Sequence, residues 1–177
     1  YADVAIEPTD ESCAAAHAAT KDLDVDGIVA VGGGSVIDTA KAVDLLRTNG
    51  GALTDYVNAP VGAGRAPHAP LLPLIAAPTT AGSGSESSGV CVMDLTRLHL
   101  KSGISHRALR PVLSVVDPLT TLTLPREATV SSGLDVLSHV LESLTASRFD
   151  TRPRATGERP TYCGANPVSD PLCREAL

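Results

Sequence analysis

Gly27-Ile-Val-Ala-Val-Gly-Gly-Gly-Ser-Val-Ile-Asp-Thr-Ala-Lys41 is the stretch of sequence that decides the fold. A short apolar strand runs into consecutive glycines, and a helix with Ser35 as its expected N-cap begins directly after them. Such a turn brings backbone N–H groups and the positive end of a helix against a phosphate. The pattern matches neither the G-x-G-x-x-G fingerprint nor a P-loop, so a tight strand-to-helix turn without a ligand remains open.

A second Gly-rich loop, Pro78–Glu86, follows the short apolar strand expected at 74–77. Its hydroxyls and free N–H groups can share the charge of a pyrophosphate and fix a ribose or a nicotinamide amide. The alternative is a Ser/Gly-rich loop that only caps a helix. Because parallel strands present their carboxyl ends at one edge of a sheet, the two loops together favour a nucleotide cleft.

The remaining pattern predicts an α/β fold with a parallel sheet, followed by an α-helical part. Helical spacing without strand character runs over 125–147, and Asp170-Pro171 starts another helix with proline at its first position. The other expected elements are a helix over 11–22 capped by Thr9 or Asp10, strands at 27–31, 90–94 and 114–116, a helix over 35–48, and irregular connections at 50–73 and 148–169.

Composition narrows the classes of function. The chain has 177 residues and a formal net charge of −6 at pH 7, so neither nucleic acid nor a membrane is expected as a partner. The four cysteines are scattered, which indicates reduced thiols and no disulfide framework, and Cys163 and Cys173 stand too far apart for ordinary zinc-site spacing. Because the chain begins with Tyr1 and ends at Leu177 inside an expected helix, we expect it to be a piece of a longer protein.

Asp135 and His139 are the candidate metal ligands. They stand four residues apart on the helix expected after Pro125, so both side chains project from one face. A carboxylate and an imidazole can ligate Fe²⁺ or Zn²⁺, although an ordinary hydrogen-bonded i,i+4 pair uses the same spacing. No catalytic side chain is predicted beyond these two ligands.

Arginines crowd the long loop that follows this helix. A guanidinium matches a carboxylate with two parallel hydrogen bonds, so the loop can recognise an acidic substrate, or it can be a solvated basic loop. The candidate substrate-binding residues are Arg152, Arg154 and Arg159.

Taken together, these motifs resemble the iron-containing (group III) alcohol dehydrogenase family. The resemblance rests on Gly32–Lys41, Pro78–Glu86, Asp117-Pro118 with Leu124-Pro125, Gly133–Glu142 and Asn166–Asp170. Within the family, three segments are similar to the hydroxyacid–oxoacid transhydrogenase subgroup. They are Val4–Thr9, Leu100–Pro111 and the long insertion ending at Asn166-Pro167.

The resemblance implies an α/β nucleotide-binding domain over 1–124, lacking its N-terminal part, and the truncated start of a helical metal-binding domain over 125–177. It implies NAD(P) and a divalent metal, Fe²⁺ or Zn²⁺, as cofactors. Gly33, Gly34 and Ser35 would hold the pyrophosphate; Thr79, Thr80 and Ser83 would contact phosphate, ribose or nicotinamide; Lys101 would contact a ribose hydroxyl; Asp135 and His139 would be two of the metal ligands. The family uses two further histidines as metal ligands, so the 177 residues on their own are expected to be inactive and poorly folded.

The implied activity is metal-dependent hydride transfer, with 4-hydroxybutyrate as donor and 2-oxoglutarate as acceptor, through a nicotinamide cofactor that stays bound. An ordinary NAD(P)-dependent alcohol dehydrogenase and a non-catalytic nucleotide-binding module remain as alternatives. The resemblance further implies small-molecule hydroxyacid, oxoacid or alcohol substrates, a homo-oligomer at full length, and a mitochondrial location in a eukaryote or a cytoplasmic one in a bacterium.

Overall fold

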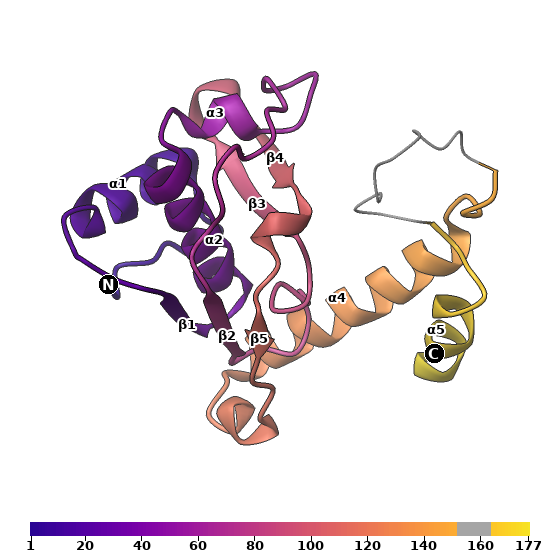
Figure 1. Ribbon diagram of the computed structural model, residues 1–177. Helices are drawn as coiled ribbons and strands as arrows, with labels where there is room; N and C mark the ends of the chain where they lie inside the picture. The colour runs from indigo at the N-terminus through magenta and orange to yellow at the C-terminus, as the bar shows by residue number, and fades with distance from the viewer. Residues whose placement is uncertain (152–163) are drawn as a thin grey trace.

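Three parallel strands form the central sheet of the computed structural model, which describes residues 1–151 and 164–177. The strand order is β1 (Ile28–Gly32), β2 (Leu74–Pro78) and β5 (Leu113–Ser114), as Figure 1 shows. The register pairs Gly32 with Pro78, so β1 and β2 end level with each other. Both Gly-rich loops therefore leave the sheet from the same edge.

Helix α2 (Gly34–Asn49) packs against the sheet on one side and against a β-hairpin and helix α1 (Asp10–Thr20) on others. The hairpin consists of the antiparallel strands β3 (Val90–Leu95) and β4 (Leu100–Ser105). Ile37 packs with apolar residues of β1 and β2, whereas Leu45 belongs to a larger core shared with the hairpin and α1. Because neighbours enclose α2 on several sides, even charged residues of this helix are buried.

From residue 126 onward, the described part of the chain is mainly helical. Helix α4 (Arg126–Thr145) extends away from the sheet, and helix α5 (Ser169–Ala176) packs against α4 (Figure 1). The short elements are α3 (Leu53–Tyr56) and single 3₁₀ turns at Thr96–Leu98, Arg107–Leu109 and Pro118–Thr121. Among the residues that the structure describes, no helix combines the length and the apolar character needed to cross a membrane.

The predicted α/β class with a parallel sheet is confirmed, and so is the cap of α1. Thr9 accepts a hydrogen bond from the Ser12 backbone N–H, and the Ser12 hydroxyl accepts one from the Thr9 N–H. The prediction that Ser35 caps α2 is wrong, because Gly33 is the N-cap and Ser35 is the second residue of the helix. Pro171 is likewise the third residue of α5 and not its first.

One strand and one α-helix went unpredicted. Strand β4 contains Lys101, Ser102 and Gly103, which carry little strand propensity, so its pairing with β3 supplies what the local sequence lacks. Helix α3 is a single turn inside the connection expected over 50–73. A helix that short leaves no periodic pattern to recognise.

Candidate functional site

The two Gly-rich loops touch each other at the carboxyl ends of β1 and β2. We call them the first loop (residues 32–35) and the second loop (residues 79–89). The Thr79 N–H donates a hydrogen bond to the Gly32 carbonyl at 3.0 Å. A Cβ atom on Gly34 would lie only 2.6 Å from Ser83 Oγ and 2.8 Å from Ser83 Cβ. Glycine at position 34 is therefore what lets the second loop lie directly against the start of α2.

The start of α2 is open to a ligand. No side chain caps the helix, since the N-cap is Gly33, so the N–H groups of its first turn are free of a side-chain acceptor. Those N–H groups and the helix dipole make a helix start favourable for an anion. The glycine cap thus replaces the expected serine cap with a backbone surface that a phosphate can approach.

A cavity of about 840 Å³ lies between the two loops, the hairpin and α4. Seven of the nine predicted cofactor and metal residues line it: Gly34, Ser35, Thr80, Ser83, Lys101, Asp135 and His139. Gly33 and Thr79 occupy the same loops without lining the cavity; a Cβ atom on Gly33 would lie 3.2 Å from Thr80 Cγ2. Predicted site residues as far apart in the sequence as Gly34 and His139, 105 positions, therefore meet at one cavity.

The Asp135 and His139 side chains lie side by side on α4. Asp135 Oδ1 and His139 Nε2 are 3.5 Å apart, and each side chain is about half exposed. A Cβ atom on Gly82 would lie 3.0 Å from the Ser132 backbone and 3.2 Å from Asp135 Oδ2, so the second loop comes close to this pair. One carboxylate oxygen and one imidazole nitrogen fit a divalent metal ion. Within 1–151 and 164–177, no cluster of three or more potential ligands is present, so the described residues do not form a complete metal site by themselves.

Lys101 reaches the cavity from β4. Its ammonium lies 3.2 Å from Glu7 Oε2, and the Glu7 N–H donates a hydrogen bond to Ser35 Oγ at 3.1 Å. Glu7 also adopts a left-handed backbone conformation, with φ of 56°. The segment around Glu7 therefore connects the first loop to Lys101 along one side of the cavity.

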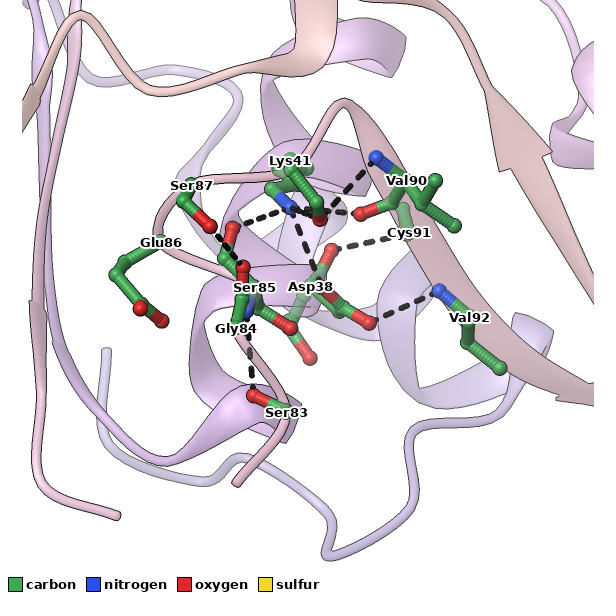
Figure 2. A network of polar contacts seen from close by, with 12 residues as sticks. Asp38, Lys41, Ser83, Gly84, Ser85, Glu86, Ser87, Val90, Cys91 and Val92 are labelled. Carbon is green, nitrogen blue, oxygen red and sulfur yellow. Dashed lines mark hydrogen bonds and ion pairs between the residues drawn. The ribbon is translucent and has the colours of Figure 1, made fainter. Parts of the chain in front are cut away.

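A buried polar network lies behind the second loop, and sequence reasoning missed it (Figure 2). Lys41 is fully buried and Asp38 is 7% exposed, and their charged groups lie 3.6 Å apart. Burial lowers the pKa of Lys41 and raises the pKa of Asp38, and in each residue the opposite charge of the other opposes that change. An Asp and a Lys one turn apart inside the Gly-rich motif were the available signal, but such a pair is ordinarily solvated.

None of the described residues of the arginine-rich loop, 148–151 and 164–169, lines this cavity. Arg152, Arg154 and Arg159 lie outside the described residues. Arg148 donates two hydrogen bonds to Asp150, at 3.0 and 2.8 Å.

The Asn166–Asp170 motif begins helix α5. The Asn166 side chain accepts hydrogen bonds from the Val168 and Ser169 N–H groups, so this part of the motif has a structural role.

The structure thus combines an α/β fold, two Gly-rich loops at one sheet edge and a carboxylate–imidazole pair on a helix beside the same cavity. The model of the iron-containing alcohol dehydrogenase family matches residues 1–118, and the chain belongs to this family. The family's description names iron, and the Zn²⁺ alternative has no support in these comparisons.

Curated relatives match the whole chain. The chain is 49% identical to a mitochondrial hydroxyacid-oxoacid transhydrogenase of Caenorhabditis elegans and 48% identical to that of Mus musculus. Each alignment covers 100% of this chain and 39% of the relative, so the chain spans well under half the length of these proteins.

Solved structures share the fold. The NADH-dependent butanol dehydrogenase A of Thermotoga maritima aligns with a TM-score of 0.77 and 27% identity, over 97% of this chain and 38% of that one. Sulfoacetaldehyde reductase of Bifidobacterium kashiwanohense, solved with NAD⁺, aligns with a TM-score of 0.73 and 31% identity, over 84% of this chain and 40% of that one.

Proposed function

We propose that the protein carrying this chain is an iron-dependent hydroxyacid–oxoacid transhydrogenase. It would oxidise a hydroxyacid such as 4-hydroxybutyrate and reduce an oxoacid such as 2-oxoglutarate through a nicotinamide cofactor. The observation that carries the proposal is the single cavity lined by both Gly-rich loops and by the Asp135–His139 pair. The whole-chain similarity to relatives bearing this name supports the choice of substrates.

The first and second loops would bind the nucleotide. Backbone N–H groups at Gly33, Gly34 and Ser35 would face the pyrophosphate at the start of α2, where the helix dipole favours negative charge. The hydroxyls of the second loop and the Lys101 ammonium would donate hydrogen bonds to the remaining polar groups of the cofactor; the loop residues are Thr79, Thr80 and Ser83. Because the loops touch each other, binding at one constrains the other.

Asp135 and His139 would hold the iron, together with ligands from outside the described residues. Iron bound there would polarise the substrate oxygen as a Lewis acid. The chain's own contribution is positional, since Gly82 lets the second loop lie against α4 and so sets the spacing between cofactor loop and metal pair. We extend the proposal to the domain arrangement, with 1–124 as the nucleotide-binding domain and 125–177 as the start of the metal-binding domain.

The test uses the full-length, iron-loaded protein with 4-hydroxybutyrate and 2-oxoglutarate and without added nucleotide. Formation of 2-hydroxyglutarate is the expected result. Product or NADH that appears only after NAD⁺ is added would instead indicate an ordinary alcohol dehydrogenase. Binding of NADH with no turnover under either condition would indicate a non-catalytic module.

A histidine comparison tests the metal pair. His139→Ala should abolish turnover and reduce the iron content, because it removes one of the two ligands proposed on α4. His17→Ala is the matched control, since His17 lies on α1 and does not line the cavity. Equal iron content in both variants would refute the assignment.

A further inference from the structure

The chain between β5 and α4 is attached to the end of β2 through Thr120. The Thr120 hydroxyl donates a hydrogen bond to the Pro78 carbonyl at 2.9 Å, across 42 positions of sequence. The same oxygen lies 2.7 Å from the Asp117 carbonyl inside its own 3₁₀ turn, so the two carbonyls share the single hydroxyl hydrogen. The bond to Pro78 is the one that leaves the turn and reaches the sheet.

This bond continues the hydrogen-bond ladder of the sheet at the point where β5 ends. The Leu74 and Ala76 carbonyls of β2 accept hydrogen bonds, at 2.9 and 2.8 Å, from backbone N–H groups of the segment around β5. Because alternate carbonyls of a strand point the same way, the Pro78 carbonyl is the next in this series. The chain turns away from the sheet after Asp117, and the Thr120 hydroxyl supplies the donor from the side-chain end.

The contact fixes the peptide group from which the second loop starts. The carbonyl of this peptide belongs to Pro78 and accepts from Thr120, and its N–H belongs to Thr79 and donates to the Gly32 carbonyl at 3.0 Å. Both polar groups of one planar peptide are therefore held, one by the first loop and the other by the turn that precedes α4. A displacement of that turn would shift the start of the second loop.

The same turn also determines where α4 begins. Short-range backbone hydrogen bonds fill the stretch from the turn to the helix, including one from the Leu124 N–H to the Thr121 carbonyl at 3.0 Å. The metal pair lies on α4, whose backbone at Ser132 meets the second loop at Gly82. The second loop and α4 are thus connected at two places, at Gly82 and through Thr120.

We propose that Thr120 is a positioning residue for hydride transfer, which holds the second loop and α4 at the spacing that brings cofactor and substrate together. In that transfer a C–H bond of the hydroxyacid breaks, the hydrogen leaves with its electron pair for the nicotinamide ring, and the hydroxyl proton is released. Thr120 does not line the cavity, so it acts through the Pro78 carbonyl. The inference rests on the proposed function for the identity of the reaction.

The experiment uses the full-length, iron-loaded protein and compares two neighbouring threonines. Thr120→Val keeps the shape of the side chain and removes the hydroxyl, whereas Thr120→Ser keeps the hydroxyl. Thr121→Val is the matched control, because Thr121 is half-buried in the same way and its hydroxyl donates within the turn, to the Pro118 carbonyl at 2.8 Å. Thr120→Ala compared with Thr120→Ser gives a second pair that differs by the hydroxyl, and it is used if the valine variant does not fold.

Four quantities are measured on each protein. They are the Tm, the iron content, the dissociation constant of NADH, and the single-turnover rate of hydride transfer from 4-hydroxybutyrate to bound NAD⁺. The transfer is followed by NADH absorbance, with ordinary substrate and with substrate deuterated at the carbinol carbon. A primary isotope effect in the wild type and the variants identifies the measured rate as that of C–H cleavage.

The expected pattern separates positioning from binding and from stability. Thr120→Val should slow hydride transfer about 10-fold or more, because small misplacements of reacting groups are costly. Its iron content should be unchanged, and its dissociation constant for NADH should stay within about 3-fold of the wild type. Thr120→Ser should transfer hydride within about 3-fold of the wild-type rate, and Thr121→Val within about 2-fold.

Four results would overturn the proposal. If Thr120→Val and Thr121→Val slow the transfer equally, the bond to Pro78 has no special part in it. If the rate of Thr120→Val falls in parallel with its NADH affinity or its iron content, Thr120 supports binding and not spacing. If Thr120→Ser is as slow as Thr120→Val, the hydroxyl is not the contact that matters. If the wild-type protein itself transfers no hydride, the proposed function fails together with this inference, and that outcome is recognised before any variant is made.

Discussion

Asp44 provides a test of the structure that is independent of any ligand. The residue lies on α2 with only 1% of its surface exposed, and its Oδ1 accepts a hydrogen bond from the Leu72 N–H at 3.0 Å. Burial raises the pKa of Asp44 from 3.8 to about 6, against the opposing effects of that hydrogen bond and of the Arg47 charge. Because each pKa unit corresponds to about 1.4 kcal/mol, keeping Asp44 ionised in the folded state costs about 3 kcal/mol.

The sign of the pH dependence follows from proton binding. Between pH 3.8 and about 6, the folded state keeps the Asp44 proton that the unfolded state releases. The contribution of Asp44 to the free energy of unfolding therefore falls as the pH rises through this window, and it is constant above it. At pH 4 the carboxyl is largely protonated in the folded state, so most of the penalty is absent.

Asp44→Asn removes the ionisation and keeps a carbonyl oxygen that can accept from the Leu72 N–H. We expect the variant to be about 1 to 3 kcal/mol more stable than the wild type at pH 7.5, and the difference to shrink toward zero at pH 4. Urea unfolding of both full-length proteins, followed by circular dichroism between these two pH values, measures the difference. A difference that does not change with pH, or a variant that is less stable at pH 7.5, would refute the reasoning.

Three further predictions concern contacts made by small residues and by one arginine. Gly34→Ala should lower the unfolding free energy by about 1–3 kcal/mol and weaken NADH binding, because the new Cβ overlaps Ser83. Adding Ser83→Gly should recover part of both losses, measured by denaturation for stability and by titration for NADH affinity. Gly82→Ala should lower the Tm, because the added Cβ meets the α4 backbone at Ser132. At Gly133, on α4, an added Cβ meets no atom within 4 Å, so Gly133→Ala should leave the Tm unchanged or raise it. Arg47→Met should speed amide hydrogen exchange in the last turn of α1, because the guanidinium no longer binds the carbonyls of Thr20, at the end of the helix, and of Leu23, just after it. Unchanged exchange would contradict this role.

Much of the nucleotide-type site was predictable because its requirements are local. A strand, a run of glycines and a helix occupy consecutive residues around Gly32, and each piece has its own composition signal. Asp135 and His139 were predictable for a similar reason, since four-residue spacing on a helix places two side chains together. The predicted cap of α2 was wrong because serine is a common N-cap residue, whereas Gly33 is the N-cap in this structure.

The buried groups of α2 were not predictable in the same way. Charged residues such as Asp38, Lys41 and Asp44 normally mark a solvated helix face. In this protein the hairpin, the second loop and the segment before β2 cover that face. Their carbonyl groups accept hydrogen bonds from Lys41, and the Val92 and Leu72 N–H groups donate to Asp38 and Asp44. The covering segments lie about 30 to 50 residues downstream, so no local pattern around α2 announces them.

The sequence alone determined the strand and helix on either side of the first Gly-rich loop, the second Gly-rich loop and the four-residue spacing of Asp135 and His139. These features depend on backbone freedom, side-chain periodicity and hydrogen-bonding groups that neighbouring residues supply. Only the tertiary structure decided that Gly82 brings the second loop against α4, that the Lys41 ammonium binds the Ser85 and Val90 carbonyls, and that Asp38 is buried beside it. Burial and close approach depend on what packs against a residue from elsewhere in the chain, and that is a property of the folded molecule.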